Sequence, residues 1–78
     1  MSEWRETDAA IVRDWEFANF AAALEFVNRV GEVAEEANHH PDILLHGWNK
    51  VRLTLSTHSA GGVTDADHAM AARLDALE

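Results

Sequence analysis

Hydrophobic and polar residues alternate along two stretches of the chain, as they do along half-buried β-strands. The first stretch covers residues 9–17, where Arg13 interrupts the alternation. The second covers residues 46–58 and is the clearer of the two, with an apolar face made of Val51, Leu53 and Leu55. Counting by twos along it, Trp48 and His58 fall on the opposite, polar face, unless a bulge shifts the register. Both stretches are therefore predicted to be strands.

A helix is expected between these strands, over residues 20–38. Asn19 precedes it and belongs to the residue types favoured at helix N-caps. Pro41 cannot continue a helix and moves His40 out of the helical region, so the helix should end near Asn38. Its apolar positions form a broad face, which would cover a sheet and meet another subunit. They are Phe20, Leu24, Val27 and Ala34, flanked by Phe26, Val30, Val33 and Ala37.

A second helix is predicted from Thr64, because Asp67 stands three positions later and completes a capping box. Its expected buried stripe is Ala66, Met70, Leu74 and Leu77. Trp4 and the turn-forming residues 6–8 favour a short strand before the first stretch. The elements then follow the order β-β-α-β-β-α, with the division between the third and fourth strands near residues 41–48 left open. This order predicts an α+β two-layer sandwich: an antiparallel four-stranded sheet with two helices on one face.

Length and charge narrow the classes of function. The 78 residues allow one domain, residues 1–78, and so small a core favours homo-oligomers. With no cysteine, disulfides and thiolate zinc sites are excluded. A net charge of -8 argues against direct nucleic-acid binding. No apolar run approaches the roughly 20 residues of a membrane helix, and no signal peptide is evident, so a soluble cytoplasmic protein is expected.

Three histidines carry the candidate chemistry. His39 and His40 lie at the expected end of the first helix, and His58 lies at the end of the long strand on the face of Trp48. The helix dipole and Glu35, four residues before His39, both favour a protonated imidazole, as a general acid requires. An aromatic side chain on the same face could stack a flat heterocycle. The residues thus indicate an acid/base site for a planar substrate.

Simpler interpretations exist for each of these residues taken alone. A histidine pair before a proline is commonly an ordinary polar helix terminus, and Trp48 alone would more often be a packing aromatic. Asp67 could serve only as a helix cap, and Glu35 could simply be solvated. Three histidines could also bind zinc, but adjacent side chains usually diverge at such a turn, so no metal site is expected.

Taken together, these residues resemble the pterin-4a-carbinolamine dehydratase family. The family's pattern is a polar residue, three others, then His-His-Pro, followed at set spacings by an aromatic residue, a histidine and an aspartate. The matching positions here are Glu35, His39, His40, Pro41, Trp48, His58 and Asp67. The resemblance extends over roughly residues 4–77, and a pattern of this many parts is far more specific than the histidine pair. His46 and His68 match no position of the family and are expected on the surface.

The resemblance implies loss of water from 4a-hydroxytetrahydropterin to give the quinonoid dihydropterin, in recycling of the pterin cofactor of aromatic amino acid hydroxylases. No metal or redox cofactor is implied. His39 and His58 are then the candidate proton donors to the hydroxyl. His40 is expected mainly to hold the pterin and could also act as a base. Further residues are implied as substrate contacts or as supports of the histidines: Asn38, Trp48, Ser56, Thr57 and Ser59 as contacts, Glu35 and Asp67 as supports.

A second function remains open on the same fold. Proteins of this family are also dimerisation cofactors of transcription factors in animals, so the chain could be a binding module of this coactivator type without turnover. The three histidines favour retained catalysis, because an interaction role does not need them. A homodimer and a homotetramer are both compatible with the sequence.

Overall fold

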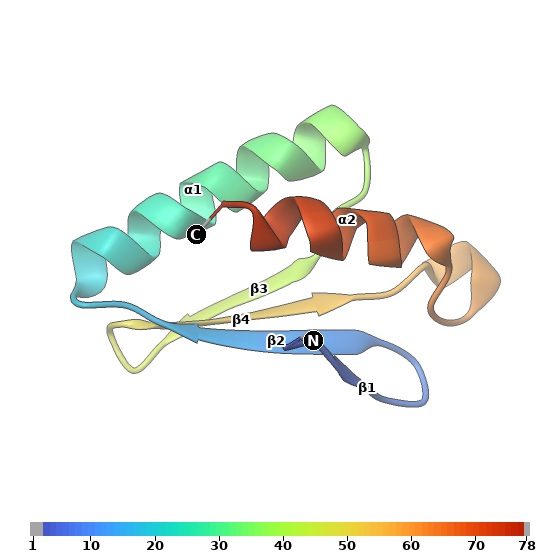
Figure 1. Ribbon diagram of the computed structural model, residues 1–78, viewed down its shortest axis with the longest axis horizontal. Coiled ribbons are helices and arrows are strands. Elements are labelled where there is room, and N and C mark those ends of the chain that lie inside the picture. The colour runs from blue at the N-terminus through green and yellow to red at the C-terminus, as the bar shows by residue number, and fades with distance from the viewer. Residues whose placement is uncertain (1–2, 78) are drawn as a thin grey trace.

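The computed structural model describes residues 3–77, apart from the side chain of His58. Both helices lie over one face of a single antiparallel sheet with the strand order β1-β2-β4-β3 (Figure 1). In chain order the elements are β1 (Arg5–Glu6), β2 (Ile11–Glu16), α1 (Phe20–Ala37), β3 (Asp42–His46), β4 (Lys50–Leu55), the 3-10 helix η1 (His58–Ala60) and α2 (Asp65–Asp75). The predicted α+β sandwich and its element order are confirmed.

The predicted strand at residues 46–58 is wrong in its extent. The chain instead turns at residues 47–49, between β3 and β4, and β4 ends at Leu55. Gly47 and Trp48 both have positive φ, 56° and 59°, which reverses the chain within three residues. His58 therefore does not lie on the strand but begins η1. The division that the sequence left open near residues 41–48 is thus a hairpin.

The core fills the space between the sheet and the helices. The inward face of β4 is buried, as its alternation predicted, and α2 contributes Met70 and Leu74. The buried apolar residues are Ile11, Trp15, Ala23, Phe26, Val30, Ala34, Val51, Leu53, Leu55, Met70, Ala71 and Leu74. Ala66, predicted to be buried in α2, is exposed, and the neighbouring Asp67 is buried instead.

The apolar face of α1 is rotated relative to its prediction. Asn19 caps the helix as expected, since its Oδ1 accepts the backbone N–H of Ala22 at 2.8 Å. The buried stripe consists of Ala23, Phe26, Val30 and Ala34, whereas Phe20 and Leu24 are exposed. Leu24 lies about 100° around the helix from Ala23, and Phe20 lies in the first turn. The apolar residues of α1 cover a wider surface than the sheet buries. The periodicity of the sequence alone did not show which part of that surface faces the sheet.

Candidate active site

The C-terminal end of α1 determines where His39 leaves the helix. Asn38 adopts the left-handed conformation, with φ 52°. Its backbone N–H donates to the Glu35 carbonyl at 3.3 Å, and the N–H of His39 donates to the Ala34 carbonyl at 3.1 Å. These two bonds form a Schellman motif, which satisfies the last carbonyls of the helix. Because the turn is hydrogen-bonded, His39 starts from a defined backbone position.

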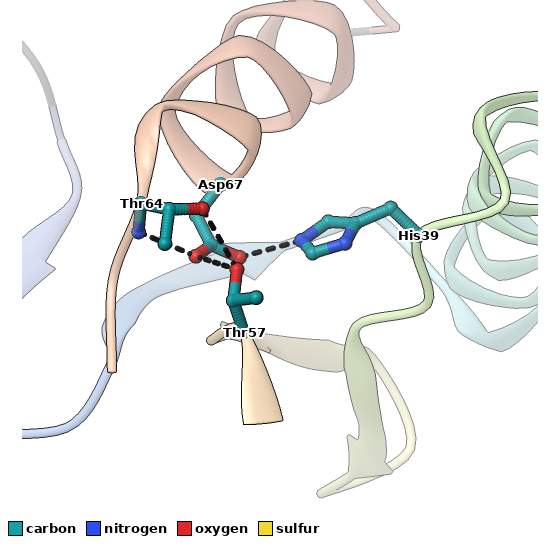
Figure 2. A network of polar contacts seen from close by, with 4 residues as sticks. All are labelled: His39, Thr57, Thr64 and Asp67. Carbon is teal, nitrogen blue, oxygen red and sulfur yellow. Dashed lines mark hydrogen bonds and ion pairs between the residues drawn. The ribbon is translucent and has the colours of Figure 1, made fainter. Parts of the chain in front are cut away.

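His39 reaches across to Asp67 in the first turn of α2, as Figure 2 shows. Its Nε2 lies 2.6 Å from Asp67 Oδ1. The other carboxylate oxygen accepts the Thr57 hydroxyl at 2.7 Å and the Thr64 backbone N–H at 2.9 Å. Thr57 Oγ1 also lies 2.8 Å from the Thr64 hydroxyl, and since the proton of Thr57 goes to Asp67, Thr64 donates here. Three groups therefore donate to the carboxylate directly, and the Thr64 hydroxyl supports one of them, Thr57.

Asp67 is ionised in this environment, although its side chain is 0% exposed. Burial raises the pKa of Asp67, but donation by the Thr64 N–H, by His39 and by Thr57 outweighs it, and the net pKa is lowered. A carboxylate with no proton can only accept, so Nε2 of His39 carries the hydrogen. Nδ1 has no hydrogen-bond partner among the described residues and is the nitrogen left for chemistry.

His40 pairs with Glu35, through a close contact between Nε2 and Oε2. The expectation that Glu35 would support His39 is wrong, because it assumed that the helical spacing of four residues continues to His39. The left-handed Asn38 ends the helix first, so that His39 turns to α2 and His40 returns to Glu35. Both side chains of this second pair are largely exposed. The two adjacent rings are thus separated, each held by its own carboxylate.

A hollow of about 470 Å³ lies beside these rings, within the range typical of small-molecule sites. It is lined by Asn38, His39, His40, Pro41, Asp42, Ser56, Thr57 and Ser59. The structure therefore brings together six of the eight predicted catalytic and substrate-contact residues, from the end of α1, the end of β4 and η1. The hydroxyl of Thr57 is occupied by Asp67 and Thr64. The side chain of His58, the third predicted catalytic group, lies outside the described residues.

Trp48 is the exception among the predicted site residues. It lies in the turn between β3 and β4, whereas the hollow lies where β3 begins and β4 ends. Placing it on one strand face with His58 was wrong, because the turn breaks the alternation. The five residues of β3 separate the two ends by four residue steps, roughly 14 Å of extended chain. Within one chain, Trp48 does not line the hollow.

Sequence reasoning did not single out Thr64 as part of the site. It identified Thr64 and Asp67 only as a capping box, and Asp67 Oδ2 does accept the Thr64 N–H as that motif requires. The same carboxylate also holds His39, which lies 28 positions earlier. The sequence offered one indication that the start of α2 belongs to the site: Asp67, the acid of the capping box, follows the histidine pair at the spacing of the family pattern. One residue thus starts α2 and orients a ring at the end of α1.

The remaining described histidines, possible metal sites and possible membrane helices were also considered in the sequence, and the structure describes each of them. His46 and His68 are exposed, as expected of surface residues. Apart from the undescribed side chain of His58, no three His, Asp or Glu side chains are placed so that they could hold a metal ion. Over residues 3–77, neither helix is long and apolar enough to cross a membrane.

Comparison with known proteins identifies the family. The model of the pterin 4 alpha carbinolamine dehydratase family matches residues 1–77, so the chain belongs to that family. A relative from Thermomicrobium roseum is 51% identical over 74 residues, covering 95% of this chain and 78% of its own. Another from Gloeobacter violaceus is 51% identical over 78 residues, covering 95% and 84%. Both are provisionally named pterin-4-alpha-carbinolamine dehydratases.

Solved structures agree with this assignment and widen the range of roles. A transcriptional coactivator/pterin dehydratase from Brucella melitensis superposes with a TM-score of 0.87 at 36% identity, covering 96% of this chain and 81% of its own. A pterin dehydratase-like protein, identified as a RuBisCO assembly factor in the alpha-carboxysome, superposes with a TM-score of 0.82 at 29% identity, covering 97% and 89%. Members of this fold therefore include both a pterin dehydratase and an assembly factor by name.

Proposed function

We propose that this chain dehydrates 4a-hydroxytetrahydropterin to quinonoid dihydropterin and water, as a step in recycling the tetrahydropterin used by aromatic amino acid hydroxylases. The observation that carries the proposal is the buried, ionised Asp67 holding His39 at the edge of an open hollow. A carboxylate that orients an imidazole and leaves its other nitrogen free is the arrangement used for proton transfer in catalysis. The family membership supplies the pterin as the substrate class.

The reaction breaks the bond between C4a and its hydroxyl oxygen. His39, in its protonated form, donates the Nδ1 proton to that oxygen, which leaves as water. The lone pair of N5 forms the double bond to C4a, and the N5 proton passes to a base. Asp67 keeps hold of Nε2–H throughout and stabilises the imidazolium form, so the ring changes charge without changing orientation. No redox equivalent is consumed, because water is the only group lost.

The remaining site residues bind the ring. His40 is the other described imidazole on the hollow, and we assign it to holding the pterin and accepting the N5 proton, with Glu35 as its partner. Asn38, Ser56 and Ser59 offer polar groups along the same hollow. Thr57 acts through Asp67 as a positioning residue. The assignment of His58 as a second proton donor rests on the sequence pattern.

A non-catalytic binding role is the second candidate, and one observation favours it. Phe20 and Leu24 are exposed on α1, an apolar surface suited to a protein partner or to a further copy of the chain. The names of the two structural neighbours, coactivator and assembly factor, point the same way. A purely binding role would not need an imidazole held at the hollow with one nitrogen unpaired, and we therefore rank it second.

A stopped-flow assay on freshly generated 4a-carbinolamine tests the proposal. The wild-type chain should accelerate dehydration over the spontaneous rate, and His39→Ala should lower the enzymatic rate at pH 7 by at least ~10², the usual contribution of an acid-base group. His68→Ala removes an exposed histidine from α2 outside the hollow and serves as the matched control. Absence of acceleration by the wild type would reject the enzymatic role, and a loss under threefold in His39→Ala would remove His39 from it.

A further inference from the structure

Asp42 is the only acidic side chain among the described residues that line the hollow. It lies exposed at the start of β3, and its carboxylate makes no hydrogen bond or ion pair with another described residue. The two carboxylates beside the histidines are already engaged. Asp67 is buried and accepts three hydrogen bonds, and Glu35 holds His40 and does not line the hollow. Within the described chain, a ligand in the hollow therefore meets one carboxylate with both oxygens open.

The sheet register places Asp42 on the side of the hollow away from His39. Asp42 pairs with Thr54, which lies between two buried leucines of β4. Because side chains alternate along a strand, Asp42 and Thr54 belong to the face of the sheet that the helices leave uncovered (Figure 1). His39 turns instead to Asp67 on α2, on the covered face. The hollow thus has a histidine on one side and a carboxylate on the other.

A pterin ring has a matching polarity. Its pyrimidine edge carries two adjacent hydrogen-bond donors, N3–H and the 2-amino group, and C2 occupies the corner of that ring opposite C4a. A pterin whose C4a lies near His39 therefore turns its 2-amino group away from this histidine. A carboxylate accepts two parallel N–H donors of this kind, as it does from an arginine side chain in a bidentate pair. The donor edge of the ring and the open carboxylate of Asp42 then lie on the same side of the hollow.

We propose that Asp42 determines the specificity of the hollow, by accepting hydrogen bonds from N3–H and from the 2-amino group of the pterin. The identity of the ligand as a pterin rests on the proposed function. Asp42 exchanges no proton with the substrate and acts on binding alone. A lumazine ring, which has an oxygen in place of the 2-amino group, would set that oxygen against the carboxylate. This repulsion makes the hollow selective for a 2-amino-4-oxo ring over a 2,4-dioxo ring.

Binding of pterin and of lumazine, two fluorescent rings that differ at position 2, tests this assignment. The wild type should bind pterin more tightly than lumazine by at least ~10-fold, the size of one hydrogen bond to a charged group. In Asp42→Asn the amide oxygen still accepts N3–H, but the amide N–H now faces position 2 and favours the oxygen of lumazine. The ratio of the two dissociation constants should therefore shift towards lumazine by at least ~10-fold. An unchanged ratio would overturn the assignment.

Three further variants separate recognition by Asp42 from other causes. Asp8→Asn removes the same charge from an exposed position between β1 and β2, outside the hollow, and should leave both dissociation constants unchanged. Asp42→Ala should weaken pterin binding by roughly 10-fold and leave lumazine binding no weaker, whereas a merely structural role would weaken both. Glu35→Gln tests the other exposed carboxylate. A shift in Glu35→Gln as large as that in Asp42→Asn would move the recognition to Glu35 and reject the proposal.

Recognition and reaction are tested separately, because both rings bind without reacting. If the wild type does not accelerate dehydration but Asp42→Asn shifts the ligand preference, the proposed reaction is wrong and the recognition stands. If dehydration is accelerated, Asp42→Asn should raise KM by roughly 10-fold and change kcat by less than about threefold, since only binding is affected. A fall in kcat with an unchanged KM would place Asp42 in proton transfer and overturn its role in recognition. A wild type that binds neither ring would also overturn it.

Discussion

Replacing Asp67 with asparagine tests the central element of the site. The carboxylate accepts three hydrogen bonds, from His39, Thr57 and Thr64, at 2.6, 2.7 and 2.9 Å. Bonds to a charged acceptor are worth roughly 1 kcal/mol more than neutral ones, so loss of the charge over three bonds should lower the free energy of unfolding by about 3 kcal/mol at pH 7. For a domain of this size that is a large fraction of the total stability.

The same substitution also alters the chemistry of His39. If the asparagine oxygen stays with Thr57 and Thr64, its amide group faces Nε2 of His39, which must then accept. The proton moves to Nδ1 and the ring is locked in the wrong tautomer, without a charge to stabilise the imidazolium. Removing a carboxylate that supports a functional histidine typically costs 10–100-fold, and we expect a loss of about that size in the dehydration rate.

The loss of stability in Asp67→Asn should depend on pH, and the pKa of Asp67 determines the direction of that dependence. The folded-state pKa of Asp67 lies below its ordinary value of 3.8, so its ionised form stabilises the fold above that pH, and this contribution is lost as the pH falls through the folded-state pKa. The stability difference between the wild type and Asp67→Asn should therefore be smaller at pH 3 than at pH 7.

Urea unfolding followed by tryptophan fluorescence measures this difference at pH 7 and at pH 3. Asp65→Asn, which removes an exposed charge from the same helical turn, is the matched control and should change the unfolding free energy by less than about 0.5 kcal/mol. A difference under 1 kcal/mol for Asp67→Asn at pH 7, or an equal difference at both pH values, would refute the reasoning.

Two further predictions concern α1 and use the same unfolding assay. Asn19→Ala removes the acceptor of the Ala22 N–H and should destabilise the chain by about 1 kcal/mol; an unchanged midpoint would show that the cap is not needed. Gly31→Ala should stabilise it by up to about 1 kcal/mol, because Gly31 lies inside the helix and an added Cβ would meet nothing within 4 Å. Destabilisation would mean that Gly31 is required for close packing, for instance against another copy.

Local rules predicted much of the fold because each works within a few residues. Asn19, Pro41 and the Thr64–Asp67 pair mark helix ends through backbone chemistry that any chain obeys. The alternation of β4 needed only one buried face. The position of the turn between β3 and β4 was left open by the sequence, because this turn needs two consecutive positive φ values and Trp48 is a residue that normally avoids them. The hydrogen bonds of the buried Asn49 to Phe17 hold this turn in place despite the unfavourable backbone conformation of Trp48.

Most of the residues expected at the site line one hollow, but their contacts differ from those expected. Helical spacing singled out Glu35 beside the histidine pair, and the family resemblance added Asp67, but the spacing paired Glu35 with the wrong histidine. A single left-handed residue, Asn38, decides which ring meets which carboxylate, and its φ is not encoded in the spacing. The bond from His39 to Asp67 joins the end of one helix to the start of another. It depends on how both helices lie over the sheet, which no local pattern contains.

A crystal structure with bound 7,8-dihydropterin would test the central claim most directly. The account predicts that the ring lies in the hollow between the end of α1 and the end of β4. C4a should face Nδ1 of His39, at a distance that a hydroxyl on C4a would bridge by a hydrogen bond, and N5 should face His40. The His39–Asp67 bond should be retained. A ring bound elsewhere, or bound in the hollow with C4a directed away from His39, would contradict it.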